Sequence, residues 1–178
     1  MSGHSHWAGI KHKKEATDQK RGKVFSKLLA AVSAAAKSEP NPDFNPRLRT
    51  AIMKAKEASV PQDNIDRAVK RASEPGTNLD ELVFEAYGPG GAAILMEAIS
   101  DNRNRTVQEV KTALRDQDGK WAETGSVQWA FEPTPGDERG WRAKFPQEIP
   151  AEDRKKLDAL VEALMEIEDV QKVFTNAA

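Results

Sequence analysis

The sequence predicts an α+β protein, in which a basic three-helix N-terminal domain is followed by a ferredoxin-like β-α-β-β-α-β domain with an extra leading strand. Apolar residues recur at helical spacing in the first part of the chain, Pro75-Gly76 interrupts the pattern, and short apolar strands separated by two helical segments follow. We therefore expect a flexible basic arm over 1–14, a helical domain over 15–74, a linker over 75–82 and the ferredoxin-like domain over 83–178.

Three helices are expected in the first domain. The first spans 15–38, where Val24, Leu28 and Val32 form an apolar face and the alanine-rich end favours helix. Asn45-Pro46 supplies a cap and a first-turn proline for the second helix, and Pro61 opens the third.

The hydrophobic period changes after the linker. Strands are expected on both sides of Gly88-Pro89-Gly90-Gly91, which can form only a turn or loop. In chain order the expected elements are strand 83–87, strand 92–99, helix 104–116, strand 126–131, strand 141–145, helix 152–167 and strand 170–174. Trp121, Trp129 and Trp141 fall in or beside these strands, and we assign them to core packing.

The formal net charge of -1 conceals a separation of charge along the chain. Residues 1–72 hold 15 Lys and Arg against 7 Asp and Glu, whereas residues 73–178 hold 12 against 21. A segment this basic attracts polyanions and releases their counterions on binding. The first part of the chain is therefore predicted to bind nucleic acid, and the acidic remainder to avoid it or to face a basic partner.

Several functional classes are disfavoured by what the sequence lacks. The chain has no Cys, which excludes disulfides, thiolate metal sites and cysteine nucleophiles and suits the cytoplasm. No apolar run approaches membrane-spanning length, so no membrane partner is expected. No nucleophile with its base, paired carboxylates or phosphate loop is evident. We therefore expect neither catalysis nor a cofactor.

The first 14 residues combine cations and hydrogen-bond donors with one aromatic ring. Trp7 can stack on an exposed base while the neighbouring cations contact phosphates, and the alternative is a solvated basic tail. The candidate contacts of this arm are His4, Trp7, Lys11, His12, Lys13 and Lys14. The histidines lack an evident carboxylate partner, so we expect adventitious chelation and no metal site.

Cations on the predicted helices extend the candidate surface. Lys20, Lys23 and Lys27 share one face of the first helix. The other candidates in the helical domain are Arg21, Arg47, Arg49, Arg67, Lys70 and Arg71. Arg103 and Arg105 lie at a predicted helix N-terminus, where cations oppose the macrodipole. They either clamp a phosphate or form ion pairs with nearby acids such as Asp101 and Glu109.

A series of short motifs along the chain is similar to successive signatures of the YebC/PmpR family. The motifs are Gly3-His4-Ser5, Ile10-Lys11-His12, Lys20-Arg21-Gly22-Lys23, Asn45-Pro46-Arg47-Leu48-Arg49, Asp63-Asn64-Ile65, Tyr87-Gly88-Pro89-Gly90-Gly91, Asp101-Asn102-Arg103-Asn104-Arg105-Thr106, Gly125-Ser126-Val127 and Thr175-Asn176-Ala177. The resemblance covers nearly the whole chain. It implies no catalysis, and either a DNA-binding transcriptional regulator or a ribosome-associated translation factor.

Typical members of that family are longer and carry a further domain between the strands expected at 126–131 and 141–145. Here only residues 132–140 connect these strands, and Pro133-Thr134-Pro135-Gly136 is predicted to join them directly. His6, Gly9 and Phe174 stand where the family usually has Lys, Asn and Tyr. We still expect nucleic-acid binding, because the basic arm and helices remain.

The favoured interpretation is a translation-associated factor that binds ribosomal RNA through the helical domain and places the Trp7 arm in an RNA site. The alternative is a transcriptional regulator of duplex DNA, for which the sequence offers no clear recognition helix. A second alternative is a protein-interaction module whose acidic domain binds a basic partner. A lone aromatic residue in a polar arm favours unpaired RNA over duplex DNA.

Overall fold

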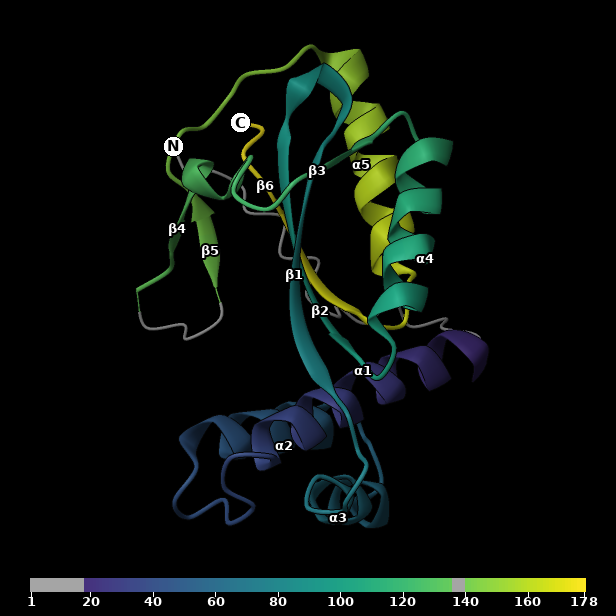
Figure 1. Ribbon diagram of the computed structural model, residues 1–178, viewed down its shortest axis with the longest axis vertical. Coiled ribbons are helices and arrows are strands. Elements are labelled where there is room, and N and C mark those ends of the chain that lie inside the picture. The colour runs from purple at the N-terminus through teal and green to yellow at the C-terminus, as the bar shows by residue number, and fades with distance from the viewer. Residues whose placement is uncertain (1–17, 136–139) are drawn as a thin grey trace. The chain divides into compact units, whose positions relative to one another are not determined.

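The computed structural model of the 178-residue chain describes residues 18–135 and 140–178 (Figure 1). These residues form two compact units: a helical unit with residues 18–81 and 99–103, and a sheet unit with residues 82–98 and the described residues from 104 onwards. The arm expected over 1–14 lies outside the described residues. No helix in the described ranges is long and apolar enough to cross a membrane.

The helical unit contains the three helices that the sequence predicted, α1 (Asp18–Ala36), α2 (Pro46–Glu57) and α3 (Gln62–Arg71). α1 packs against both of the others, and the Ser33 hydroxyl on α1 donates a hydrogen bond of 2.8 Å to the Ala68 carbonyl on α3. The shared core consists of residues at helical spacing, namely Val32, Ala35, Ala36, Leu48, Ala55, Val60, Ile65 and Ala68. α1 is therefore the common support for the two shorter helices.

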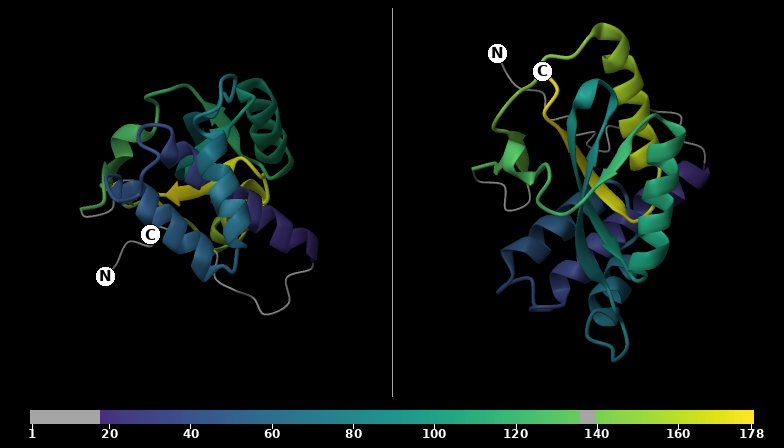
Figure 2. Two further views of the ribbon diagram at one scale, coloured as in Figure 1. Left: turned by 90° about the horizontal axis from the view of Figure 1, so that it is seen from below. Right: turned by 45° about the horizontal axis from the view of Figure 1, so that its top comes forward.

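The sheet unit is built on four strands in the order β3-β1-β2-β6. The strands are β1 (Asp80–Tyr87), β2 (Ala93–Ser100), β3 (Lys120–Ala122) and β6 (Val170–Thr175). β1 pairs with β3, and β2 with β6, in antiparallel orientation. α4 (Arg103–Asp116) and α5 (Ala151–Met165) cover one face of this sheet (Figure 1, Figure 2). Phe84, Met96, Val110 and Leu160 are among the buried residues between the sheet and the two helices.

The α+β class agrees with the prediction, whereas the positions of β1 and β3 in the sheet differ from it. β1, the predicted extra leading strand, lies between β3 and β2 and begins at Asp80, inside the expected linker. β3 takes one edge of the sheet and was not predicted. A strand of three residues, Lys120–Ala122, is too short to produce a recognisable alternation of apolar and polar residues.

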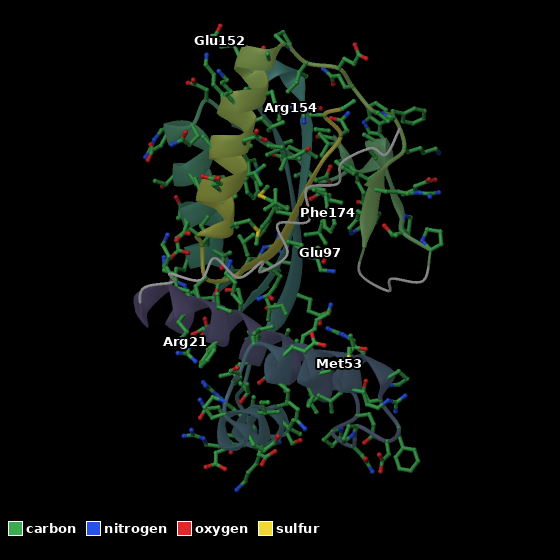
Figure 3. All side chains as sticks on the ribbon, turned by 180° about the vertical axis from the view of Figure 1, so that it is seen from behind. Arg21, Met53, Glu97, Glu152, Arg154 and Phe174 are labelled. Carbon is green, nitrogen blue, oxygen red and sulfur yellow. The ribbon has the colours of Figure 1, made fainter. Side chains whose placement is uncertain are left out.

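The other face of the sheet is partly covered by a second, two-stranded sheet of β4 (Phe131–Pro133) and β5 (Trp141–Ala143) (Figure 1). Phe131 pairs with Ala143, so β4 and β5 pair directly, as their short connection predicted. The apolar layer beneath this hairpin consists of Ala93, Leu95, Ala122, Val127, Ala130, Phe131 and Phe174. Figure 3 labels Phe174 and Glu97 on strands of the main sheet, between α5 and the hairpin.

The prediction of a strand over residues 126–131 is wrong. A 3-10 turn, η2 (Gln128–Ala130), precedes β4 there, and neither element joins the four-stranded sheet. Val127, Ala130 and Phe131 are buried, and this spacing fits a tight turn rather than the alternation of a strand. Ser126 to Phe131 therefore forms a cover over the sheet instead of a strand within it.

Two of the three tryptophans pack as predicted. Trp121 is partly buried with its ring centroid 5.4 Å from that of Phe84, and the Trp141 indole nitrogen donates a hydrogen bond of 2.8 Å to the Glu97 carboxylate. The packing prediction is wrong for Trp129, whose side chain is 64% exposed. Trp129 lies within η2, between the inward-facing Val127 and Ala130, so the tight turn directs its ring outward.

The turn between β1 and β2 contains η1 (Pro89–Gly91) and agrees with the prediction. Gly90 and Gly91 have φ angles of 70° and 75°, in the left-handed region that favours glycine. At Gly88 an added Cβ atom would lie 2.7 Å from Leu157 Cδ1 and 2.9 Å from Ile94 Cδ1, so these two buried side chains would have to shift to admit it. The turn therefore lets α5 pack closely against the start of β2.

Replacing Gly88 with alanine is expected to lower the free energy of unfolding by about 1–3 kcal/mol, the usual cost of overpacking a filled core. Urea-induced unfolding checks this value. Gly22→Ala is the control, since an added Cβ on this glycine of α1 meets nothing within 4 Å. It is expected to raise stability by about 0.5–1 kcal/mol. Equal unfolding midpoints for Gly88→Ala and the parent chain would contradict the packing argument.

Candidate nucleic-acid interface

The start of α2 is fixed by one buried asparagine. The Asn45 side-chain oxygen accepts a hydrogen bond of 2.9 Å from the Leu48 amide, and its nitrogen donates to the carbonyls of Ala35 at 2.8 Å and Glu39 at 2.7 Å. One side chain thus caps α2 and ties it to the end of α1, as the Asn45-Pro46 signal predicted for the cap. This anchor sets which residues of α2 face outward.

Exposed cations lie on the outward faces of α2 and α3. Arg49, Met53 and Lys56 follow one another at helical spacing along an exposed side of α2, turned away from buried Leu48 and Ala55. Met53 is 53% exposed and is labelled in Figure 3. We define the basic surface as the exposed cations of these two helices, Arg49, Lys54, Lys56, Arg67, Lys70 and Arg71.

Two arginines of the basic surface are held by neutral groups. Arg49 Nη1 donates hydrogen bonds to the carbonyls of Pro42 at 2.7 Å and Asp43 at 3.0 Å. Arg67 donates to the side-chain oxygen of Asn64 and, at 3.3 Å, to the Asp63 carbonyl. Backbone and amide oxygens orient a guanidinium group without cancelling its charge. Both arginines are therefore ordered and still available to a phosphate.

The predicted face of α1 varies in exposure along its length. Lys20 and Arg21 are exposed, and the Arg21 guanidinium carbon lies 5.5 Å from the Phe25 ring centroid (Figure 3). Lys23 is half-buried, and Lys27 is 7% exposed. Lys27 is therefore the member of the predicted set that a phosphate reaches least easily.

Arg47 belongs to α2 but differs from the basic surface. Its guanidinium group forms an ion pair with the Glu81 carboxylate, beside a hollow of about 370 Å³ that Lys37 and Leu79 also line. The Lys37 ammonium group donates a hydrogen bond of 3.2 Å to the Leu79 carbonyl. Because a carboxylate already offsets its charge, Arg47 contributes less to the attraction of a polyanion than Arg49 does.

At the start of α4 the structure favours an ion pair for one of the two predicted arginines. Arg105 lies 2.9 Å from Asp169, whose same oxygen accepts a hydrogen bond of 2.6 Å from the Thr106 hydroxyl. Asp169 is not one of the acids that the sequence suggested. Arg103 is exposed. The arm candidates His4, Trp7, Lys11, His12, Lys13 and Lys14 lie outside the described residues.

Sequence reasoning missed an exposed aromatic residue beside the basic surface. Phe44 is 76% exposed in the turn before α2, where its amide donates to the Asn41 carbonyl at 3.1 Å. A residue in a loop has no periodicity from which exposure can be read. The signal was the turn chemistry of Asn41-Pro42-Asp43 immediately before the cap. In the described part of the chain no group of three or more His, Asp or Glu side chains could hold a metal ion.

Two family descriptions match the chain. Residues 5–75 match the TACO1/YebC protein N-terminal domain, and residues 79–135 match the TACO1/YebC second and third domain. The chain belongs to the TACO1/YebC family. The second match ends at the connection between β4 and β5, where the resemblance placed the further domain of longer members.

Individual TACO1/YebC relatives agree with this assignment. A probable transcriptional regulatory protein of Desulfosudis oleivorans is 42% identical over 188 residues, which cover 97% of this chain and 74% of the relative. One of Solibacter usitatus is 52% identical over 134 residues, which cover 74% of this chain and 54% of the relative. The matched region thus spans between about half and three quarters of these relatives' length.

A solved TACO1/YebC-like structure has the same fold. The conserved hypothetical protein Aq1575 from Aquifex aeolicus superposes with a TM-score of 0.86 at 32% sequence identity. The superposition covers 98% of this chain and 97% of that one.

Replacing Asn45 with alanine is expected to lower the free energy of unfolding by about 2 kcal/mol or more, because the helix cap is removed and two carbonyls are left without their donor. Urea unfolding followed by circular dichroism measures the change. Asn41→Ala is the matched control in the same loop, since the side chain of exposed Asn41 accepts one hydrogen bond, from the Asp43 amide at 2.9 Å. It is expected to cost less than about 1 kcal/mol. Equal costs would refute the anchoring role of Asn45.

Proposed function

We propose that the chain is a nucleic-acid-binding regulator of gene expression that docks on phosphates through the basic surface. The observation that carries the proposal is the set of exposed cations on α2 and α3, two of them held by neutral oxygens. Phosphate contacts from Lys and Arg supply affinity and fix the orientation of a protein on nucleic acid. The relatives' description as regulatory proteins supports this class over an enzyme.

The primary partner in this proposal is ribosomal RNA, which would make the chain a translation-associated factor. The sequence of the arm supports this choice, because Trp7 lies between cationic and polar residues in the chain, a composition that suits an unpaired RNA site. In the described part of the chain, Phe44 offers an exposed ring next to Asp43, whose carbonyl accepts a hydrogen bond from Arg49. Aromatic rings stack on unpaired bases and do not read a closed duplex.

Duplex DNA is the second candidate partner, which would make the chain a transcriptional regulator. The relatives' name supports it. The helical unit also offers a helix-turn-helix connection, with Ser59 at a φ of 64° between α2 and α3. In Figure 1 α2 lies across the view whereas α3 is seen end-on, so the two helices cross. α3 carries Arg67, Lys70 and Arg71 and would be the helix that enters a groove.

Co-sedimentation with ribosomes at near-physiological salt, with excess duplex DNA as competitor, separates these partners. We expect retention on ribosomes, and a loss of affinity when Trp7 is replaced with alanine, since stacking is worth about 1–3 kcal/mol per base. The salt dependence of that variant should stay unchanged, because a ring releases few counterions. Transfer to the DNA would favour the transcriptional regulator. Binding to neither would refute nucleic-acid binding and favour a protein partner of the acidic sheet unit.

Reversing two charges on α3 tests the basic surface itself. Lys70→Glu with Arg71→Glu is expected to weaken binding and to reduce the salt dependence by about 0.7–0.9 log units per log unit of salt for each phosphate that is no longer neutralised. Lys155→Glu with Lys156→Glu is the matched control, with the same change of net charge on exposed residues of α5. An equal effect of both pairs would point to net charge alone and contradict the proposed surface.

A further inference from the structure

Three exposed aromatic side chains gather on the face of the sheet unit that carries the β4–β5 hairpin. Tyr87, Trp129 and Phe145 are 39%, 64% and 50% exposed. The Trp129 and Phe145 ring centroids are 5.6 Å apart with the rings tilted by 45°. The Tyr87 hydroxyl and the Trp129 indole nitrogen both donate to the Ser126 carbonyl, at 3.3 Å and 2.8 Å. We call these three residues the aromatic row.

A buried carboxylate fixes the segment that presents Trp129. Glu85 is 2% exposed, and its two oxygens accept hydrogen bonds from the amides of Gly125 at 2.5 Å, Val127 at 2.7 Å and Gln128 at 3.0 Å. Three bonds to one ionisable group hold the backbone immediately before Trp129. The ring therefore sits outside the core on a segment that cannot easily turn it inward.

The backbone of Phe145 is also held by hydrogen bonds, one of them from a buried side chain. Its amide donates to the Ala130 carbonyl at 3.3 Å, and its carbonyl accepts from the side-chain nitrogen of Asn176 at 3.1 Å. Asn176 is 6% exposed, and its side-chain oxygen accepts from the Ala93 amide at 2.8 Å. Exposed rings on a mobile loop cost entropy when they bind, whereas rings held by buried anchors are already ordered.

Lysines flank the aromatic row at both ends. The Lys144 ammonium group lies 5.4 Å from the Phe145 ring centroid. Lys120 is exposed and lies directly opposite Tyr87 in the β1–β3 pair, so their side chains leave the same face of the sheet. Among the described residues no carboxylate forms an ion pair with either lysine. The row is thus a set of rings with a lysine at each end, neither of them paired with a carboxylate of the described residues.

We infer that the aromatic row binds unpaired nucleotides, with bases stacked on Trp129 and Phe145 and adjacent phosphates beside Lys120 and Lys144. Stacked rings flanked by cations are the common means of holding a single strand. This inference rests on the proposed function, and it adds a second binding surface, in the sheet unit, that selects single strands over duplexes.

The hydrogen bonds of the row favour bases over a proline-rich peptide. Aromatic grooves that bind extended peptides use tryptophan and tyrosine donors to hold the peptide carbonyls. Here the Trp129 and Tyr87 donors are both directed at the Ser126 carbonyl of the chain itself. The Trp129 and Phe145 side chains stay 64% and 50% exposed, and base stacking needs no donor.

The test is the affinity of the full chain for an unstructured uridine oligonucleotide of about 12 nucleotides and for a duplex of equal length. Trp129→Ala and Phe145→Ala are each expected to weaken single-strand binding by about 5- to 150-fold per base unstacked. Duplex binding and the salt dependence should change little. Trp129→Phe should retain much of the affinity. Val83→Ala is the matched control, because Val83 is a 46% exposed apolar residue on β1 outside the row.

Each result separates this inference from the proposed function. Weaker single-strand binding in the Trp129 and Phe145 variants alone, with folding checked by thermal unfolding, supports the row. If these variants bind the oligonucleotide as the parent chain does, or if a proline decamer displaces it from the parent, the inference is overturned. The Lys70 and Arg71 reversals report on the basic surface instead, since they alter salt dependence on both strand types.

Discussion

The sheet unit depends on one buried carboxylate. A carboxylate in a protein interior costs several kcal/mol unless its oxygens are fully bonded. Glu85 meets this requirement with three backbone amides from residues 125, 127 and 128, which lie about forty residues further along the chain. Hydrogen bonds to a charged group are worth about 1.5–3 kcal/mol each, so the segment is bound in one conformation. Val127, Ala130 and Phe131 then close over the sheet, and Trp129 is left outside.

In the helical unit a buried neutral side chain, Asn45, plays the part that the buried Glu85 carboxylate plays in the sheet unit. Asn45 is 7% exposed and joins the end of α1 to the first turn of α2 through both ends of its amide. A buried polar side chain has few arrangements that satisfy all of its atoms, whereas apolar contacts tolerate small shifts. The apolar core of each unit supplies the cohesion, and one polar residue sets the orientation of the elements that carry the exposed groups.

The contrast between apolar cores and single buried polar residues explains which features could be predicted from the sequence. The three helices, the glycine turn and the direct β4–β5 connection follow from periodicity, caps and turn residues, which are local signals. The strand over 126–131 failed because Glu85, in an alternating strand, looks like a solvent-facing residue. Nothing nearby in the chain indicates that distant amides will surround it. Trp129 was assigned to the core for the same reason, and Phe44 was missed because exposure in a loop has no period.

The acidic character of the sheet unit is compatible with nucleotides on the aromatic row. Glu152, Asp153, Asp158 and Glu162 lie on α5, which covers the opposite face of the sheet; Glu152 is labelled there in Figure 3. Packed layers are separated by about 10 Å. At physiological salt the Debye length is about 8 Å, so these carboxylates are largely screened from a strand on the hairpin side. Lys120 and Lys144, by contrast, would contact the phosphates of such a strand directly, so salt would screen their attraction much less.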